Sequence, residues 1–178
     1  MIFRLSQKLS TKIKAGTLGA LALHENPLAD WSAHVFVAGR TQYILLSNTK
    51  SLYSTVLYGK GITNDSQFIE RAVSSIREVM ADGGLEIAFR RFIAPASSSV
   101  RFAKALDRSV TGSMNDLINH ATAWLADGDV APRDVGSWLN DRLLSALAIS
   151  KAFPYGKPRE AFQALLDKAE TSTSSSEP

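Results

Sequence analysis

The sequence predicts an α+β domain in which a small antiparallel sheet packs against about four helices. Residues 33–58 contain three short segments rich in β-branched and aromatic residues, separated by turn-forming residues, which indicates a three-stranded meander. Residues 65–82 instead place apolar side chains three and four positions apart, the period of an amphipathic helix. The last third repeats the helical period, so we expect the C-terminal part to be all helical.

Size and composition favour one folded domain. The 178 residues are enough for a substantial core, and 45% hydrophobic with 21% charged residues is the balance of an ordinary soluble domain. We expect a single domain over residues 1–170, with a sheet-plus-helix core at 1–126 and a helical pair at 130–170. Residues 171–178 form a polar, low-complexity tail that we expect to be disordered.

Composition also excludes several classes of site. The absence of cysteine rules out disulfides and thiolate metal sites, and three histidines argue against an all-imidazole site. No segment approaches the roughly 18 apolar residues of a membrane span. We therefore expect a cytoplasmic protein that has no membrane contact and needs no metal or cofactor.

At the N-terminal end, residues 2–5 favour a short strand. Ser6 can then cap a short helix that carries Leu9 and Ile13 on one side. Residues 15–30 are expected to form a loop or weak helix. The meander follows, with strands at 33–37, 42–47 and 52–58, and the second strand is apolar enough for burial on both faces.

After the meander, the helix at 65–82 should end at Gly83 and Gly84 and pack across the sheet. Residues 85–89 alternate strictly between apolar and other side chains, which predicts a strand, and residues 100–105 predict another short one. Three helices are expected to finish the chain, at 113–126, 132–150 and 158–170.

The most tightly patterned polar stretch is R-S-V-T-G-S-M-N-D-L, from Arg108 to Leu117. It resembles the signature of a small bacterial family with no assigned function. Members of that family open with M-x-x-R-x-[ST]-x-K-L, as residues 1–9 do here, and they are similar through a central block that contains Trp31. The likeness covers roughly residues 1–125. It implies a common fold and brings no reaction, cofactor or partner.

Within this stretch, Ser113 is a good N-cap. Asp116, three positions later, can accept a hydrogen bond from the Ser113 backbone N–H, which would form a weaker version of the capping box. That purely structural interpretation explains both residues. An anion site is the alternative: Gly112 would let a ligand approach exposed backbone N–H groups, with Arg108 and Ser109 alongside. The sequence favours the structural interpretation.

Asp116 and His120 lie one helical turn apart and are the only candidates for catalysis. A carboxylate and an imidazole at this spacing could share a metal or act as an acid–base pair. Two ligands are too few for a metal site, and a capping Asp beside an exposed His is the commoner case. No phosphate-binding loop, dinucleotide fingerprint, zinc spacing or nucleophile elbow is present.

Charge is distributed unevenly. Residues 1–64 hold seven basic and two acidic side chains, whereas residues 65–178 hold thirteen and fifteen. A basic end favours an anionic partner such as nucleic acid or phosphate. The residues that we expect to bind a ligand are Arg4, Lys8, Arg108, Ser109 and Asn115.

Three functions follow from these observations. The one we favour is a binding protein that recognises an anionic partner, namely phosphate or nucleic acid, or a protein partner at the corner formed by residues 108–115. The second is a hydrolase or transferase acting on a phosphate-bearing substrate. The third is a purely structural protein–protein interaction module whose signature only shapes the turn into a helix.

Overall fold

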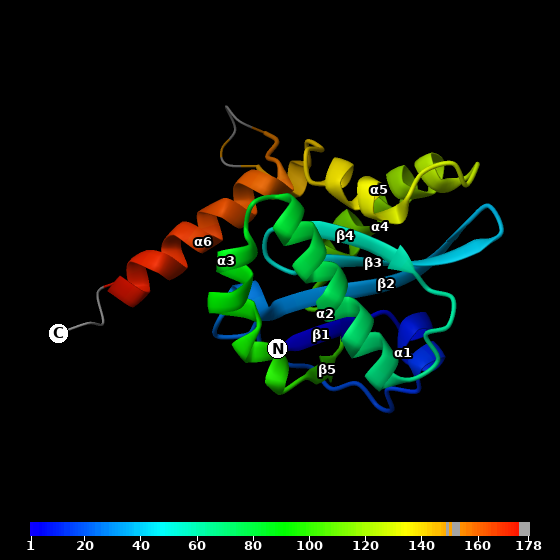
Figure 1. Ribbon diagram of the computed structural model, residues 1–178, viewed down its shortest axis with the longest axis horizontal. Coiled ribbons are helices and arrows are strands. Elements are labelled where there is room, and N and C mark those ends of the chain that lie inside the picture. Colours follow the sequence, from blue (N-terminus) through cyan, green and yellow to red (C-terminus); the bar gives the residue numbers. More distant parts are fainter. Residues whose placement is uncertain (149, 151–153, 175–178) are drawn as a thin grey trace.

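A computed structural model describes residues 1–148, 150 and 154–174. It confirms the α+β class: a five-stranded sheet in the order β4-β3-β2-β1-β5 lies between helices (Figure 1). The strands are β1 (Ile2–Leu5), β2 (Asp30–Ala38), β3 (Thr41–Asn48), β4 (Ser54–Tyr58) and β5 (Arg101–Ala103). The helices are α1 (Gln7–Ile13), α2 (Asp65–Asp82), the single turn α3 (Glu86–Ala88), α4 (Arg108–Leu125), α5 (Pro132–Leu139) and α6 (Pro158–Ser174).

The expected meander is present, and the N-terminal strand extends it. β2 pairs antiparallel with β3, and β3 pairs antiparallel with β4, so that Ile44 lies opposite Val35 on one side and Leu57 on the other. β1 runs parallel to both β2 and β5, with Phe3 opposite Trp31 and Phe102. The sheet is therefore mixed, because the chain crosses over through α1 and residues 14–29 before it returns as β2.

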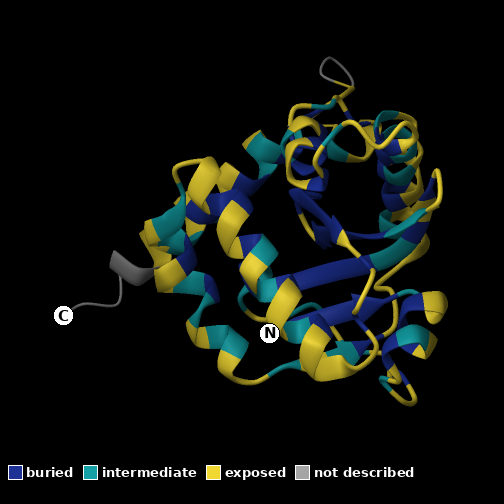
Figure 2. Cartoon of the chain, turned by 45° about the vertical axis from the view of Figure 1, so that its right-hand side comes forward, coloured by how far each residue is buried: buried dark blue, intermediate teal, exposed yellow. Residues whose placement is uncertain are grey.

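Helices cover both faces of the sheet, which explains why β3 is apolar on both sides. Ile44 and Leu46 belong to the core beneath α2, whereas Tyr43 and Leu45 belong to the core beneath α4 and α5. Figure 1 shows α2 crossing one face, and Figure 2 shows the buried positions gathered on the strands and on the inner sides of the helices. The two cores are separated by the sheet itself.

The C-terminal helices pack on these same cores. Phe162 of α6 is fully buried and stacks on Tyr53 with ring centroids 4.5 Å apart, and it also meets Trp31 edge-on at 6.2 Å. Val135 and Leu139 of α5 are buried in the second core. Helices α5 and α6 therefore pack on the same two hydrophobic cores as the sheet, α6 through Phe162, Leu165, Leu166 and Ala169.

The predicted strand at residues 85–89 is wrong. The segment forms the helical turn α3 and then a π-helical stretch, Phe89–Ile93. Leu85 and Phe89 are also four residues apart, so one helical turn places them on the same side, and the Phe89 N–H donates to the Leu85 carbonyl at 3.0 Å. Ile87, the apolar residue between them, is 82% exposed. Five residues cannot distinguish the two periods.

The second predicted C-terminal helix is too long. α5 ends at Leu139 rather than continuing to residue 150, because Asn140 turns its side chain to the sheet edge and a backbone bridge joins Leu144 to Gly156. Residues 149 and 151–153 of the predicted helix lie outside the described part of the chain.

The last helix is longer than predicted. α6 runs to Ser174, four residues into the expected disordered tail, and residues 175–178 lie outside the described part. No helix within the described residues combines the length and the apolar character that a bilayer crossing requires.

Candidate functional site

Helix α4, which carries the patterned stretch, begins earlier than the sequence suggested. Asp107 is its N-cap: the backbone of Asp107 is extended, and its carboxylate accepts the Val110 N–H at 2.9 Å. Ser113 lies in the second turn, and its hydroxyl donates to the Ser109 carbonyl at 3.0 Å. Predicting Ser113 as the cap was therefore wrong, because Asp107 supplies the same capping chemistry six residues upstream.

This shift removes the predicted anion site at the helix start. Gly112 lies inside the helix and forms no turn, so the N–H groups around Ser113 are not free helix ends. Arg108 and Ser109 occupy the exposed first turn of α4, and Asp116 is exposed in the helix interior rather than at a cap. Residues 108–117 are the N-terminal part of one continuous helix, with both buried and exposed positions.

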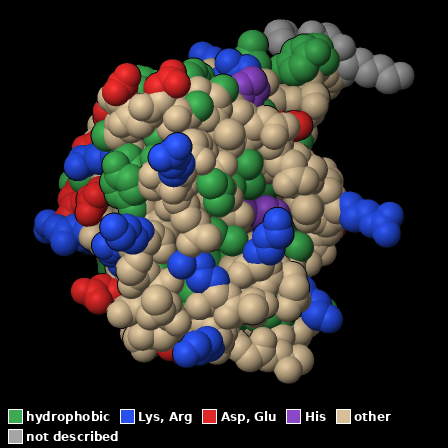
Figure 3. All heavy atoms as spheres, turned by 90° about the vertical axis from the view of Figure 1, so that its right-hand side faces the viewer, with side chains coloured by type: hydrophobic (Ala, Val, Ile, Leu, Met, Phe, Trp, Pro, Cys, Tyr) green, Lys and Arg blue, Asp and Glu red, His purple; other side chains and the backbone are tan. Residues whose placement is uncertain are grey.

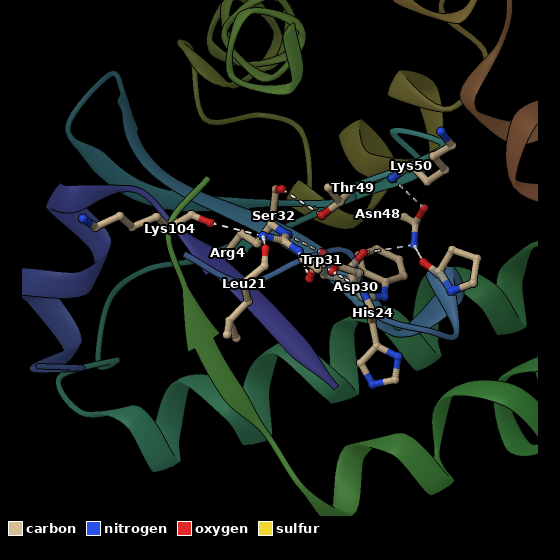
Figure 4. Close-up of polar contacts among 12 residues, drawn as sticks. Arg4, Leu21, His24, Asp30, Trp31, Ser32, Asn48, Thr49, Lys50 and Lys104 are labelled. Atoms are coloured by element: carbon tan, nitrogen blue, oxygen red, sulfur yellow. Dashed lines mark hydrogen bonds and ion pairs between the residues drawn. The ribbon is translucent and has the colours of Figure 1, made fainter. Parts of the chain in front are cut away.

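Arg4, another predicted ligand residue, is buried in the core with only 1% of its surface exposed. Its guanidinium forms a bidentate pair with Asp30, with Nε to Oδ1 at 2.7 Å and Nη2 to Oδ2 at 2.8 Å (Figure 4). The remaining donors reach the carbonyls of Ala22 at 2.8 Å, Leu21 at 3.0 Å and Lys104 at 3.4 Å. All five N–H groups are satisfied internally, so Arg4 has no donor left for a ligand.

The residues around this ion pair continue the same internal network. The Asp30 carboxylate also accepts the His24 N–H at 3.0 Å, and the Asn48 side-chain amide donates to the carbonyls of Pro27 at 2.9 Å and Asp30 at 3.1 Å. A buried charge pair with complete hydrogen bonding organises structure. Its role here is to tie the long loop before β2 to the sheet.

Two other predicted ligand residues do come together. Lys8 of α1 and Asn115 of α4 both line a surface groove of about 580 Å³, which we call the α1–α4 groove. It lies between α1, the end of β2 and α4, and an adjoining hollow of about 330 Å³ shares His34 with it and adds Lys104 and Thr111. The other polar residues of the two hollows are Ser6, Gln7 and Gln42.

The α1–α4 groove and the adjoining hollow each contain one lysine and no acidic side chain. Lys8 and Lys104 are exposed, and neither hollow has an aspartate or glutamate in its wall. Figure 3 looks at the end of the molecule that carries α1 and the β2–β3 hairpin, where lysine and arginine side chains are spaced out and acidic ones lie toward the margins. The local field therefore favours an anion.

His34 is the most distinctive residue of this groove. Burial lowers the pKa of its imidazole below the usual value, so the ring is neutral near pH 7. No described residue hydrogen-bonds either ring nitrogen, although neutral imidazole offers one donor and one acceptor. A neutral imidazole that has no partner among the described residues, in hollows that also contain Lys8 and Lys104, can donate a hydrogen bond to a bound oxygen.

The predicted catalytic pair does not form. Nε2 of His120 lies 3.0 Å from the Arg142 guanidinium, and the imidazole packs against Trp124, whereas no hydrogen bond joins His120 to the exposed Asp116. Neither residue lines the α1–α4 groove. Within the described residues, no three histidine or acidic side chains converge closely enough to hold a metal ion.

Comparison with known proteins places the chain in a family. A family model described as Domain of unknown function (DUF6933) matches residues 2–161. The chain belongs to the DUF6933 family. No curated protein and no solved structure matches it.

The DUF6933 match extends the likeness that the sequence suggested. That likeness covered roughly residues 1–125, whereas the matched region contains every strand, helices α1 to α5 and the first turn of α6. The α1–α4 groove lies wholly within it. The family therefore includes both layers of helices and not only the sheet with its first helices.

The ligand residues expected from sequence do not include His34, Gln42, Lys104 or Thr111. For His34 a signal existed: it is two residues before Phe36 on β2, so both side chains point to the face that α4 covers. A polar residue on the face of a strand that a helix covers indicates the edge of the contact between helix and sheet. The other three come from separate segments, and only the tertiary structure brings them to this groove.

Proposed function

We propose that this chain is a binding protein that holds a small anionic ligand, bearing a carboxylate or phosphate group, in the α1–α4 groove. The observation that supports the proposal is the convergence of Lys8, His34 and Asn115 from three elements far apart in sequence. A cation, a neutral imidazole and an amide are the groups that recognise an oxyanion without a metal. The absence of acidic residues from the groove wall agrees with this ligand class.

Size and shape favour a small ligand over a nucleic acid. The groove volume of about 580 Å³ suits a metabolite-sized molecule. Apolar side chains of Phe36 and Ile118 belong to the same core and both line the groove, so the ligand should carry an apolar portion beside its anionic group. Recognition of nucleic acid stays a prediction, and it would require binding that weakens steeply with added salt.

An enzymatic function has less support. Proton transfer requires an acid or base within hydrogen-bond reach of the bound molecule. His120 and Asp116 lie outside the groove, and His34 has no carboxylate partner to orient it. The arrangement suits reversible binding.

The proposal can be tested by titrating inorganic phosphate and, separately, butyrate into ¹⁵N-labelled protein while recording amide chemical shifts. We expect saturable shifts around Lys8, His34 and Asn115, with butyrate also shifting the apolar wall. Lys8→Gln should weaken binding by about fivefold, because it removes a charge worth about 1 kcal/mol at an exposed position. Lys60→Gln, which removes the same charge from an exposed turn outside the groove, is the matched control.

Equal affinities for the Lys8→Gln and Lys60→Gln variants would contradict the proposal. So would saturable shifts that cluster outside the α1–α4 groove. The His34 ring signals give a separate measure, since a bound oxyanion should raise the pKa of the imidazole.

A further inference from the structure

The α1–α4 groove continues into the hollow of about 330 Å³ beside it. Ser6, Gln7 and His34 line both spaces, and Lys104 and Thr111 line only the second, which we call the Lys104 hollow. A bound molecule can therefore extend from one space into the other along the three shared residues. The two hollows are adjoining parts of one surface.

The topology of the sheet explains why the two hollows meet at Ser6. β1 lies between β2 and β5 in the sheet, and where β1 ends the Ser6 N–H still donates to the Ala33 carbonyl of β2 at 3.0 Å. His34 follows Ala33 on β2, and Lys104 follows the end of β5. They therefore lie on either side of Ser6. Neighbouring strands are about 4.8 Å apart, so about 10 Å separates the backbones of His34 and Lys104.

Helix α4 extends along both hollows. Thr111 lines the Lys104 hollow, whereas Asn115 and Ile118 line the α1–α4 groove. These residues are spaced by four and then three positions, so they lie on one side of the helix. Four helical residues rise about 6 Å, which is the offset between the two hollows along α4. A single extended molecule of metabolite size can therefore contact both.

The charges of the two hollows indicate how many anionic groups the ligand carries. Lys8 supplies the positive charge in the α1–α4 groove and Lys104 supplies it in the Lys104 hollow, and both side chains are exposed. Among the described residues neither hollow has an arginine in its wall, so neither offers the bidentate fork that suits a phosphate group. A carboxylate carries one negative charge, whereas a phosphate monoester carries about 1.5 to 2 near pH 7. One lysine in each hollow therefore matches one carboxylate in each hollow.

Neutral donors accompany the second lysine. The Ser6 hydroxyl caps α1 by accepting a backbone N–H at 3.4 Å, and its own O–H has no acceptor among the described residues. The Thr111 hydroxyl, by contrast, donates to the Asp107 carbonyl at 3.1 Å, so its proton is already used. The Lys104 ammonium, the Ser6 hydroxyl and the Gln7 amide are therefore the donors that the Lys104 hollow offers to a carboxylate.

Both hollows also have apolar lining. Phe36 and Ile118 line the α1–α4 groove, and Leu5 and Leu18 line the Lys104 hollow. Methylene groups that contact these side chains leave water, which favours binding. This lining suits a ligand whose two carboxylates are joined by an aliphatic chain.

We propose that the ligand of the α1–α4 groove is an aliphatic dicarboxylate that spans both hollows, with one carboxylate at Lys8 and Asn115 and the other at Lys104. This inference rests on the proposed function, which requires only that the groove binds one anionic group. The offsets of about 6 Å along α4 and about 10 Å across the strands suit a spacer of about four methylenes.

Adipate is the probe, and monomethyl adipate is a ligand of the same length with one carboxylate fewer. Both are titrated, beside butyrate, into the ¹⁵N-labelled full chain at constant ionic strength. We expect adipate to bind at least about tenfold more tightly than either monocarboxylate, because its second carboxylate binds at a high effective concentration. Amide shifts should reach Lys104 and Thr111 with adipate but not with butyrate.

Lys104→Gln tests the second hollow directly. The change keeps the backbone bonds of this residue, whose N–H donates to the Gly19 carbonyl at 2.9 Å and whose carbonyl accepts from Arg4 at 3.4 Å. It should lower the affinity for adipate by at least about fivefold more than the affinity for butyrate, because the lost charge faces only the second carboxylate. Lys104→Arg keeps the charge and should retain adipate binding, and Lys60→Gln is again the matched control.

Equal affinities for adipate and monomethyl adipate would overturn the dicarboxylate, and so would equal effects of Lys104→Gln on adipate and butyrate binding. In both cases saturable butyrate shifts in the α1–α4 groove would leave the proposed function in place. The lack of saturable shifts there with phosphate, butyrate and adipate would remove both. A further ligand, 5-phosphonopentanoate, replaces one carboxylate of adipate with a phosphonate. If it bound at least about tenfold more tightly than adipate, the ligand class would be a phosphorylated acid and the dicarboxylate would be wrong.

Discussion

The start of helix α4 gives a prediction that distinguishes a helix capped by Asp107 from a helix that begins at Ser113. In the structure, Asp107 caps the helix and Gly112 lies within it, where a Cβ added to Gly112 would meet nothing within 4 Å. Asp107→Ala should therefore destabilise the protein by about 1 kcal/mol through loss of the cap. Gly112→Ala should stabilise it by about 0.8 kcal/mol, because alanine loses less conformational freedom in a helix. Ser113→Ala should change the free energy of unfolding by less than about 0.5 kcal/mol.

Urea unfolding followed by the fluorescence of the three tryptophans measures these changes. With a slope of about 2 kcal/mol per molar urea, the midpoint should fall by about 0.5 M for Asp107→Ala and rise by about 0.4 M for Gly112→Ala. A helix that began at Ser113 would give the opposite pattern: Ser113→Ala would then carry the capping cost, and Gly112→Ala would strain a turn. Either result would refute the helix start described here.

Three further predictions concern the core and the sheet edge. Arg4→Met and Asp30→Leu should each cost about 3–5 kcal/mol of unfolding free energy, because each leaves a buried charge unpaired. The double variant should cost less than the sum of the two single variants. Additive costs, measured by urea unfolding, would contradict this. Asn140→Ala should cost about 1–3 kcal/mol of unfolding free energy, because it leaves the Ser54 N–H and C=O without a partner. An unchanged melting temperature would count against the two hydrogen bonds between the Asn140 amide and Ser54. Burial raises the pKa of Tyr53 to about 12, above the value of about 10 in an unfolded chain. Stability should therefore be intact below pH 10 and fall as the pH rises toward 12, and Tyr53→Phe should flatten that fall; an equal fall in both proteins would refute it.

Elements with long, regular patterns could be predicted from sequence. The helix at residues 65–82 begins and ends where expected, because its apolar period extends over five turns and Asn64 supplies a cap. The three strands of the meander are also correct, since β-branched runs alternate there with turn residues. In both cases local preference and tertiary packing require the same conformation.

The errors occur where several local signals compete. Residues 85–89 satisfy two periods at once, and the strand period was preferred. At α4 both Asp107 and Ser113 can cap a helix, and nothing local ranks the first above the second. Beyond Leu139, the helical pattern continues in sequence, but Asn140 bonds to Ser54, which is 86 residues away. A contact at that separation cannot be seen in a local pattern.

The candidate site shows the same limit. Lys8 and Asn115 were predicted from sequence as ligand residues, and the structure places both in one groove. Arg4 was predicted to bind a ligand, but it is buried, and its burial depends on Asp30, which lies 26 residues further along the chain. Sequence periodicity does not indicate which charged residues form an ion pair.

The buried guanidinium of Arg4 has a consequence for how the molecule opens. It holds the carbonyls of Leu21 and Ala22 in the long loop before β2, together with that of Lys104 in the segment that leads into α4. Neither segment can detach alone without exposing a charged group that has lost its partners. Loops usually exchange their amide hydrogens through small local fluctuations. Here the His24 amide, which donates to the buried Asp30 carboxylate, should exchange at nearly the rate of global unfolding although it lies in an irregular loop.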